Sequence, residues 1–269
     1  MIEMGEMSAG VAITSGIMSA KMGRRTLFAA VIVLIGTSVI TQAFVQFAGG
    51  PRGDSIDLTD QIKPVADHPV IIYGLDPFIS SGGVYEPEKT IFTIGLSLSG
   101  VLFMLVGVDF GVRTHRLLKS TEAKPWRMIA NILGIGAAIS AGFGMIMITF
   151  HPFNISLVMH IFYAMQIFYS GFFWVLFSFL ARSATDDKEL KWQGYRITKI
   201  RKVIVAIVFV SLIGTIYGPS AGYMLLGAFF EWILLFSAMA GMLSNLPAYD
   251  EGRIIPLQAS TEASTNTSP

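Results

Sequence analysis

The chain has 269 residues, of which 53% are hydrophobic and only 14% are charged, and its mean hydropathy is +0.62. Soluble domains carry about 25% charged residues, so most of this chain is expected to lie in lipid. The net charge of +1 gives no support for a nucleic-acid partner, and the lack of cysteine excludes disulfides and thiolate metal sites.

Six apolar stretches are long enough to cross a bilayer, which takes about 20 residues. They are Leu27–Phe47, Thr90–Gly111, Met128–Phe150, Ile155–Ala181, Val203–Gly218 and Gly222–Leu243. We therefore predict an all-α, polytopic membrane protein with six transmembrane helices. Only four residues separate the third and fourth stretches, and only three separate the fifth and sixth, so each pair predicts a helical hairpin.

The basic residues predict the orientation of these helices. Sixteen of the nineteen fall before the first stretch, in the connections 112–127 and 182–202, or in the tail. The positive-inside rule places that side, with both termini, in the cytosol. We expect a cytosolic segment over 1–26, a membrane domain over 27–245 with an extracytoplasmic loop over 48–89, and a cytosolic tail over 246–269. The tail is predicted to be disordered because it ends in the low-complexity run QASTEASTNTSP.

The third stretch is rich in small residues. Gly134, Ala138 and Gly142 recur every four residues, which places them on one face of a helix. Faces of this kind let neighbouring membrane helices approach closely, so we expect a packing surface there.

Polar residues inside the stretches are the first candidates for function. Tyr163, Gln166, Ser170 and Trp174 follow His160 at helical spacing, which predicts a polar stripe that faces the bundle. Glu231 lies within an apolar run, where a carboxylate costs about 2.5–3.5 kcal/mol on insertion scales.

We expect His160 and Glu231 to meet in the outer half of the bundle and to form, with Tyr163 and His151, a polar or lipid-headgroup site. The alternative is that the pair is a structural hydrogen bond that joins two helices.

The sequence has no strong catalytic motif. It lacks G-x-S-x-G, H-E-x-x-H and a phosphate-binding glycine loop. Its four histidines are scattered, so no metal site and no cofactor are expected.

A family resemblance comes from the outer loop, where residues 76–92 read DPFISSGGVYEPEKTIF. This resembles the P-x-I-S-D-T-G…P-E…F segment before the second membrane helix of the DRAM family, the damage-regulated autophagy modulators. The matching residues are Pro77, Ile79, Ser80, Gly82, Pro87, Glu88 and Phe92, whereas Ser81 stands where the family usually has Asp. The glycine-rich third stretch, His160 and the pair Glu231-Trp232 are also similar to family features.

The resemblance implies a lipid-associated, multi-pass membrane protein, distantly related to proteins that remodel GPI-anchor lipids and to the N-terminal domain of yeast cell-wall biogenesis lipid-anchor proteins. It implies a plasma-membrane, endolysosomal or Golgi location, and a membrane lipid or a second membrane protein as partner. The loop motif either sets the start of the second helix or forms a headgroup-binding lip.

Three functions follow from these observations. The first is non-enzymatic lipid handling or membrane organisation, related by resemblance to autophagy, lysosomes or lipid anchors. The second is a membrane-embedded lipid-modifying enzyme that uses His160 and Glu231. The third is a channel or transporter, against which the sequence shows no internal repeat.

Overall fold

The computed structural model describes residues 11–12, 16–62, 69–186, 191–192, 194–249 and 254–255. Six of its helices are long and apolar enough to cross a membrane. They are α1 (Ala20–Phe47), α3 (Glu88–Ser120), α4 (Pro125–Ile148), α5 (Leu157–Arg182), α6 (Ile197–Ser220) and α7 (Met224–Leu243). The prediction of an all-helical fold with six spans is confirmed.

Three helices extend by more than one turn beyond the apolar stretches that predicted them. α1 begins at Ala20, where the Ser19 hydroxyl caps the helix by accepting from the Met22 N–H at 3.2 Å. α3 continues to Ser120, and α6 begins at Ile197. These extra turns are rich in lysine and arginine. Both residues favour helices, but their charge ends an apolar stretch.

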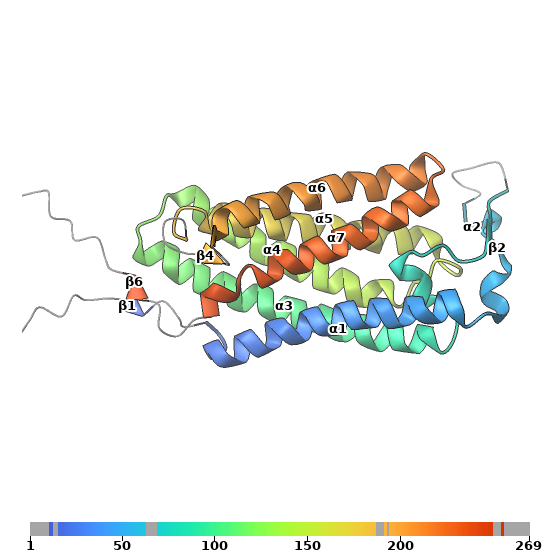
Figure 1. The fold of residues 1–269 in the computed structure, drawn as a ribbon, viewed down its shortest axis with the longest axis horizontal. Coiled ribbons are helices and arrows are strands. Elements are labelled where there is room, and N and C mark those ends of the chain that lie inside the picture. The colour runs from blue at the N-terminus through green and yellow to red at the C-terminus, as the bar shows by residue number, and fades with distance from the viewer. Residues whose placement is uncertain are drawn as a thin grey trace, which may run out of the picture.

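The six long helices pack as a ring around a common core. α1 contacts α3 and α7, α3 contacts α4, α4 contacts α5, α5 contacts α6, and α6 contacts α7. Figure 1 shows them running side by side along the long axis of the molecule. The hairpins predicted between α4 and α5 and between α6 and α7 are therefore present.

The short elements gather at the two ends of the bundle (Figure 1). One end carries η1 (Gly50–Gly53), β2 (Ser55–Asp57), α2 (Thr59–Ile62), β3 (Ile71–Tyr73) and η2 (Ile79–Gly83). We call it the loop end. β2 and β3 pair antiparallel, with Ser55 opposite Tyr73.

The opposite end, where α3, α5 and α7 finish, is called the basic end. It carries two more antiparallel pairs and a short helix: β1 (Val11–Ala12) with β6 (Ile254–Ile255), β4 (Lys191–Trp192) with β5 (Tyr195–Arg196), and η3 (Leu246–Tyr249). η3 packs against α1 and α3, so ordered structure continues past the boundary expected at residue 245. Most of the predicted tail lies outside the described residues.

Close helix contacts occur where the sequence places small residues. A Cβ added at Gly142 of α4 would lie 2.5 Å from the carbonyl oxygen of Gly100 on α3, and one at Gly107 would lie 2.2 Å from Cβ of Ala138. Only glycine fits at these two crossings. The small-residue face of the third stretch is therefore a packing surface, as predicted.

Candidate functional site

The segment that carries the predicted family motif is seated on the loop end of the bundle. The Trp232 indole N–H donates to the carbonyl of Pro77 at 2.9 Å, and the Gln42 amide donates to the carbonyl of Phe78. The N–H of Ile79 donates to Oε2 of Glu231 at 3.0 Å. Three consecutive loop residues are thus held by side chains from α1 and α7.

Residues with small side chains allow this segment to pack closely against the helices. A Cβ added at Gly82 would lie 2.6 Å from Cβ and Oγ1 of Thr41, so the backbone approaches α1 as closely as only glycine permits. Ser81 is buried, and its hydroxyl donates to the Asp76 carbonyl at 2.7 Å. The serine at the position where the family usually has Asp therefore closes a local turn.

A second attachment fixes the far side of the same loop. Arg52 donates from Nε and Nη2 to the two carboxylate oxygens of Glu88, at 2.8 and 2.7 Å. It also donates to the carbonyls of Gly49 and Glu86. Glu88 is completely buried at the start of α3, so a bidentate pair compensates its charge. Glu88 therefore anchors the loop rather than forming a free lip.

A cavity lies beneath the seated loop, with a volume of about 90 Å³. Its walls come from α1, α3, α4, α5 and α7, and η2 covers its loop end. The apolar wall includes Phe92, Phe103, Met145, Phe168, Phe172, Leu235 and Met239. Ser80 and Glu231 are its polar residues nearest the loop, and Gly171 leaves open space in the α5 wall. This arrangement suits the hydrocarbon part of an amphiphile.

The structure does not bring the four predicted site residues together. Nδ1–H of His160 donates to the carbonyl of His151 at 2.8 Å, and the His151 ring stacks on Tyr163 with 5.3 Å between centroids. Glu231 bonds instead to the Ile79 backbone. Among the described residues no contact joins His160 to Glu231, and the predicted pairing is corrected to two separate contacts.

The reason lies in where the helices begin. α5 begins at Leu157, so His160 lies in its first turn and reaches back to the α4–α5 turn. α7 begins at Met224, which places Glu231 seven residues, or about 10 Å, into the bundle. The two side chains therefore satisfy different backbone groups. Two further residues of the polar stripe face α4, where Gln166 and Ser170 donate to Ser140.

Gln42, Arg52 and Trp232 hold the loop, a role that the sequence did not predict for them. Two signals were available: Gln42 is a polar residue near the end of an apolar span, and Arg52 is one of three basic residues in an acidic loop. The signal at Gln42 names no partner, because the group that it binds is a backbone carbonyl, as is the group that Trp232 binds.

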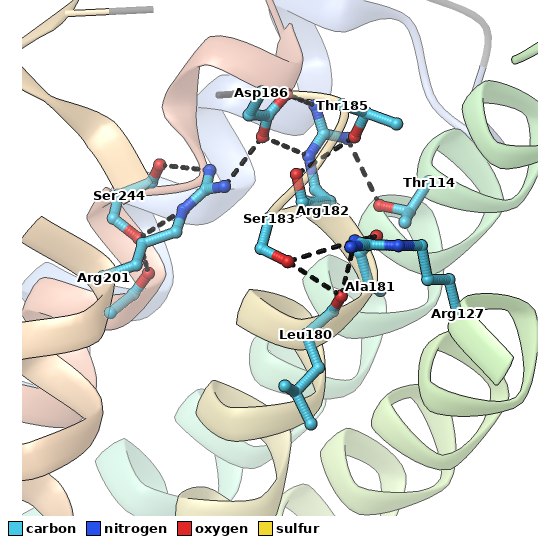
Figure 2. A network of polar contacts seen from close by, with 11 residues as sticks. Thr114, Arg127, Leu180, Ala181, Arg182, Ser183, Thr185, Asp186, Arg201 and Ser244 are labelled. Carbon is cyan, nitrogen blue, oxygen red and sulfur yellow. Dashed lines mark hydrogen bonds and ion pairs between the residues drawn. The ribbon is translucent and has the colours of Figure 1, made fainter. Parts of the chain in front are cut away.

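The basic end carries a buried polar network that joins several helices (Figure 2). Arg182 donates to both carboxylate oxygens of Asp186, at 2.7 and 2.9 Å, and Arg201 of α6 donates to the same carboxylate at 2.7 Å. Arg201 also donates to the carbonyl of Ser244 at 2.8 Å, and Arg182 donates to Thr114 of α3. This network ties together the ends of α3, α5, α6 and α7.

The charges in the network stabilise the ionised form of Asp186. Burial alone would raise the pKa of this carboxyl, but the guanidinium groups of Arg182 and Arg201 lower the pKa well below its usual range. A similar pair lies nearby, where Arg113 donates to Asp109 at 2.8 Å. That pair also holds the backbone of Met18, just before α1. None of the network residues named above lines the cavity beneath the loop, so the network fixes the bundle at its basic end.

Comparison with known proteins agrees with this architecture. No curated protein and no solved structure matches the chain. Residues 58–244 match the family described as the Frag1/DRAM/Sfk1/Cwh43P N-terminal domain. This match covers more than half of the chain and includes α3 to α7, the seated loop and the cavity wall that they form. The protein is a multi-pass membrane protein that belongs to the Frag1/DRAM/Sfk1/Cwh43P N-terminal domain family.

Proposed function

We propose that this protein handles membrane lipid without modifying it, by holding one lipid molecule in the cavity beneath the seated loop. The observation that carries the proposal is the character of the cavity, which has an apolar wall and two polar side chains at one end. Ligand sites of this kind are largely apolar, with a few polar groups that fix orientation.

Two features support a lipid rather than a soluble ligand. The walls belong to helices whose outer surfaces are also apolar, with Ile94 of α3 65% exposed and Ile161 of α5 49% exposed. A ligand would therefore reach the cavity from a hydrocarbon environment. The loop covers the cavity at the end where the membrane surface is expected.

The contacts of His160 and Glu231 give no support to the enzyme alternative. A general acid and a general base must both reach the reacting group. His160 donates Nδ1–H to the α4–α5 turn, and Glu231 holds the loop.

The test adds a side chain to the cavity wall at Gly171. This residue lines the cavity, and a Cβ there would meet no atom within 4 Å, so Gly171→Leu is accommodated and should reduce the space for a ligand. Gly136 is a matched control, because it also has no atom within 4 Å of a Cβ but lies exposed on α4 and does not line the cavity. The lipids that co-purify with each variant are counted per protein by mass spectrometry after a mild-detergent wash.

The expected result is that the wild type and Gly136→Leu retain one lipid species near one per chain, and that Gly171→Leu loses it. Equal retention of that species by all three would show that the cavity does not hold a lipid and would refute the proposal. A thermal unfolding measurement on each variant establishes that they remain folded.

A further inference from the structure

The polar end of the cavity offers hydrogen-bond acceptors and no positive charge. Among the lining residues Glu231 is the one ionisable group, and no lysine or arginine is included. The remaining polar side chains are two serines. The Ser38 hydroxyl donates to the carbonyl of Leu34 within α1, so its hydrogen is already used.

Two of these groups keep unused hydrogen-bonding capacity. Oε2 of Glu231 accepts from the Ile79 N–H, but Oε1 has no hydrogen-bond partner in the part of the chain that the structure describes. The Ser80 hydroxyl, which lines the same end, also makes no hydrogen bond to any described residue. The Glu231 carboxyl group can therefore accept further hydrogen bonds, and the Ser80 hydroxyl can accept as well as donate one.

We propose that the occupant is an amphiphile whose polar end donates hydrogen bonds and carries no negative charge, such as a long-chain amine or alcohol. The inference rests on the proposed function and specifies its ligand. A fatty acid or a phosphate-bearing lipid would place a negative charge beside Glu231 in a site of low dielectric, with no lining cation to offset it. The cavity therefore discriminates between ligands in two ways. It disfavours anionic head groups, and it accepts hydrogen bonds from head groups that donate them.

The arrangement of polar and apolar lining residues sets the orientation of this ligand. Glu231 and Met239 both line it from α7 and are eight residues apart, which is about 12 Å along a helix. The polar residues lie at the loop end, and the deeper wall is formed by apolar residues that include Phe103 and Met239. The head group would lie beneath η2, with the hydrocarbon chain extending along the helices.

The experiment uses three sixteen-carbon probes that carry the same photoreactive diazirine in the chain and differ only in the head group: a primary amine, an alcohol or a carboxylate. Each is cross-linked to the purified full-length chain in detergent at equal concentration. The labelled residues are then identified by peptide mass spectrometry.

The expected result is at least tenfold more labelling of cavity-lining residues by the amine and the alcohol than by the carboxylate. Glu231→Gln keeps an acceptor for the Ile79 N–H but removes the ionisable carboxyl group, so it should bring the amine and the carboxylate within about threefold of each other. Ser237→Ala is the matched control on the same helix. Ser237 is buried but does not line the cavity, and its substitution should leave the preference unchanged.

The outcomes separate the two proposals. Equal labelling of the cavity by all three probes would overturn the head-group inference and leave lipid binding intact. An unchanged preference in folded Glu231→Gln would also overturn it. Cavity labelling by none of the probes, with labels confined to the exposed outer faces of the helices, would overturn the lipid site itself.

Discussion

Glu231 of α7 and Ile79 of the seated loop are joined by one hydrogen bond of 3.0 Å, from the backbone N–H to Oε2. The carboxylate therefore serves as an acceptor for a loop that descends into the bundle, and the same residue lines the cavity below. This contact accounts for the presence of an acidic residue in an apolar helix.

Loss of this acceptor should loosen the loop. Glu231→Ala leaves the Ile79 N–H without a partner and should reduce the free energy of unfolding by about 1–3 kcal/mol. Glu231→Gln retains an acceptor and should cost less. Thermal unfolding in detergent measures both effects, together with hydrogen exchange at Ile79. Equal losses in the two variants would show that the charge, and not the hydrogen bond, holds the loop.

Exchange of two facing residues tests the close crossing of α3 and α4. Gly107→Ala would place a Cβ 2.2 Å from Cβ of Ala138, and overpacking of this kind costs about 1–3 kcal/mol. Adding Ala138→Gly should restore most of the stability, because the volume at the crossing is then unchanged. The thermal midpoints of the wild type, Gly107→Ala, Ala138→Gly and the double variant form a double-mutant cycle. Additive losses would mean that the helices shift apart independently of this contact.

The pair between Arg52 and Glu88 should control the mobility of the loop. Arg52→Ala leaves the buried Glu88 carboxylate without its bidentate partner, so the backbone amides of 49–62 and 69–86 should exchange hydrogen faster. Arg52→Lys should have an intermediate effect, because an ammonium cannot reproduce the two parallel hydrogen bonds. Hydrogen-exchange mass spectrometry reports both. Unchanged exchange in Arg52→Ala would show that the contacts of 77–79 suffice.

The pH dependence of stability should include a contribution from Asp186. Its pKa in the folded chain lies below the ordinary value, so the unfolded chain takes up the proton first as the pH falls. The stabilisation is therefore complete above about pH 4, where an unfolded aspartate is ionised, and is lost below it.

Asp186→Asn measures that contribution. It leaves Arg182 and Arg201 without their shared carboxylate, and breaking a buried pair of this kind costs about 3–5 kcal/mol. The difference in thermal midpoint between wild type and variant should be constant from pH 5 to about pH 8 and should shrink below about pH 4. A difference that stays constant down to pH 3 would contradict the role given to these charges.

The six spans could be predicted from sequence because each is an apolar run of membrane length, and lipid imposes helices on such runs. The small residues Gly134, Ala138 and Gly142 predicted a packing face for a similar reason, since their spacing is a local property. The helix ends were less predictable from the sequence. α6 begins six residues before its predicted start, within a basic segment that hydropathy alone excludes.

The candidate site was only partly predictable. Glu231 stands out because few residues disfavour lipid so strongly, but its partner is a backbone N–H contributed by a residue 152 positions earlier. Side-chain pairing rules point to His160 instead, because a sequence displays side chains and hides which backbone groups lack partners. The cavity itself arises from the packing of five helices, and no local pattern encodes it.

The long separation between the loop and its holders has a consequence for how the protein is made. In the segment 76–83, Ile79 is synthesised 152 residues before its partner Glu231. Pro77 is synthesised 155 residues before its partner Trp232. Until the last helix enters the membrane, Gln42 is the long-range hydrogen-bond partner of this segment among the contacts described above. Two of the three side chains that bind residues 77–79 therefore arrive together, with α7. A nascent chain that stops before α7 lacks both Glu231 and Trp232, so residues 77–79 are held on the α1 side alone.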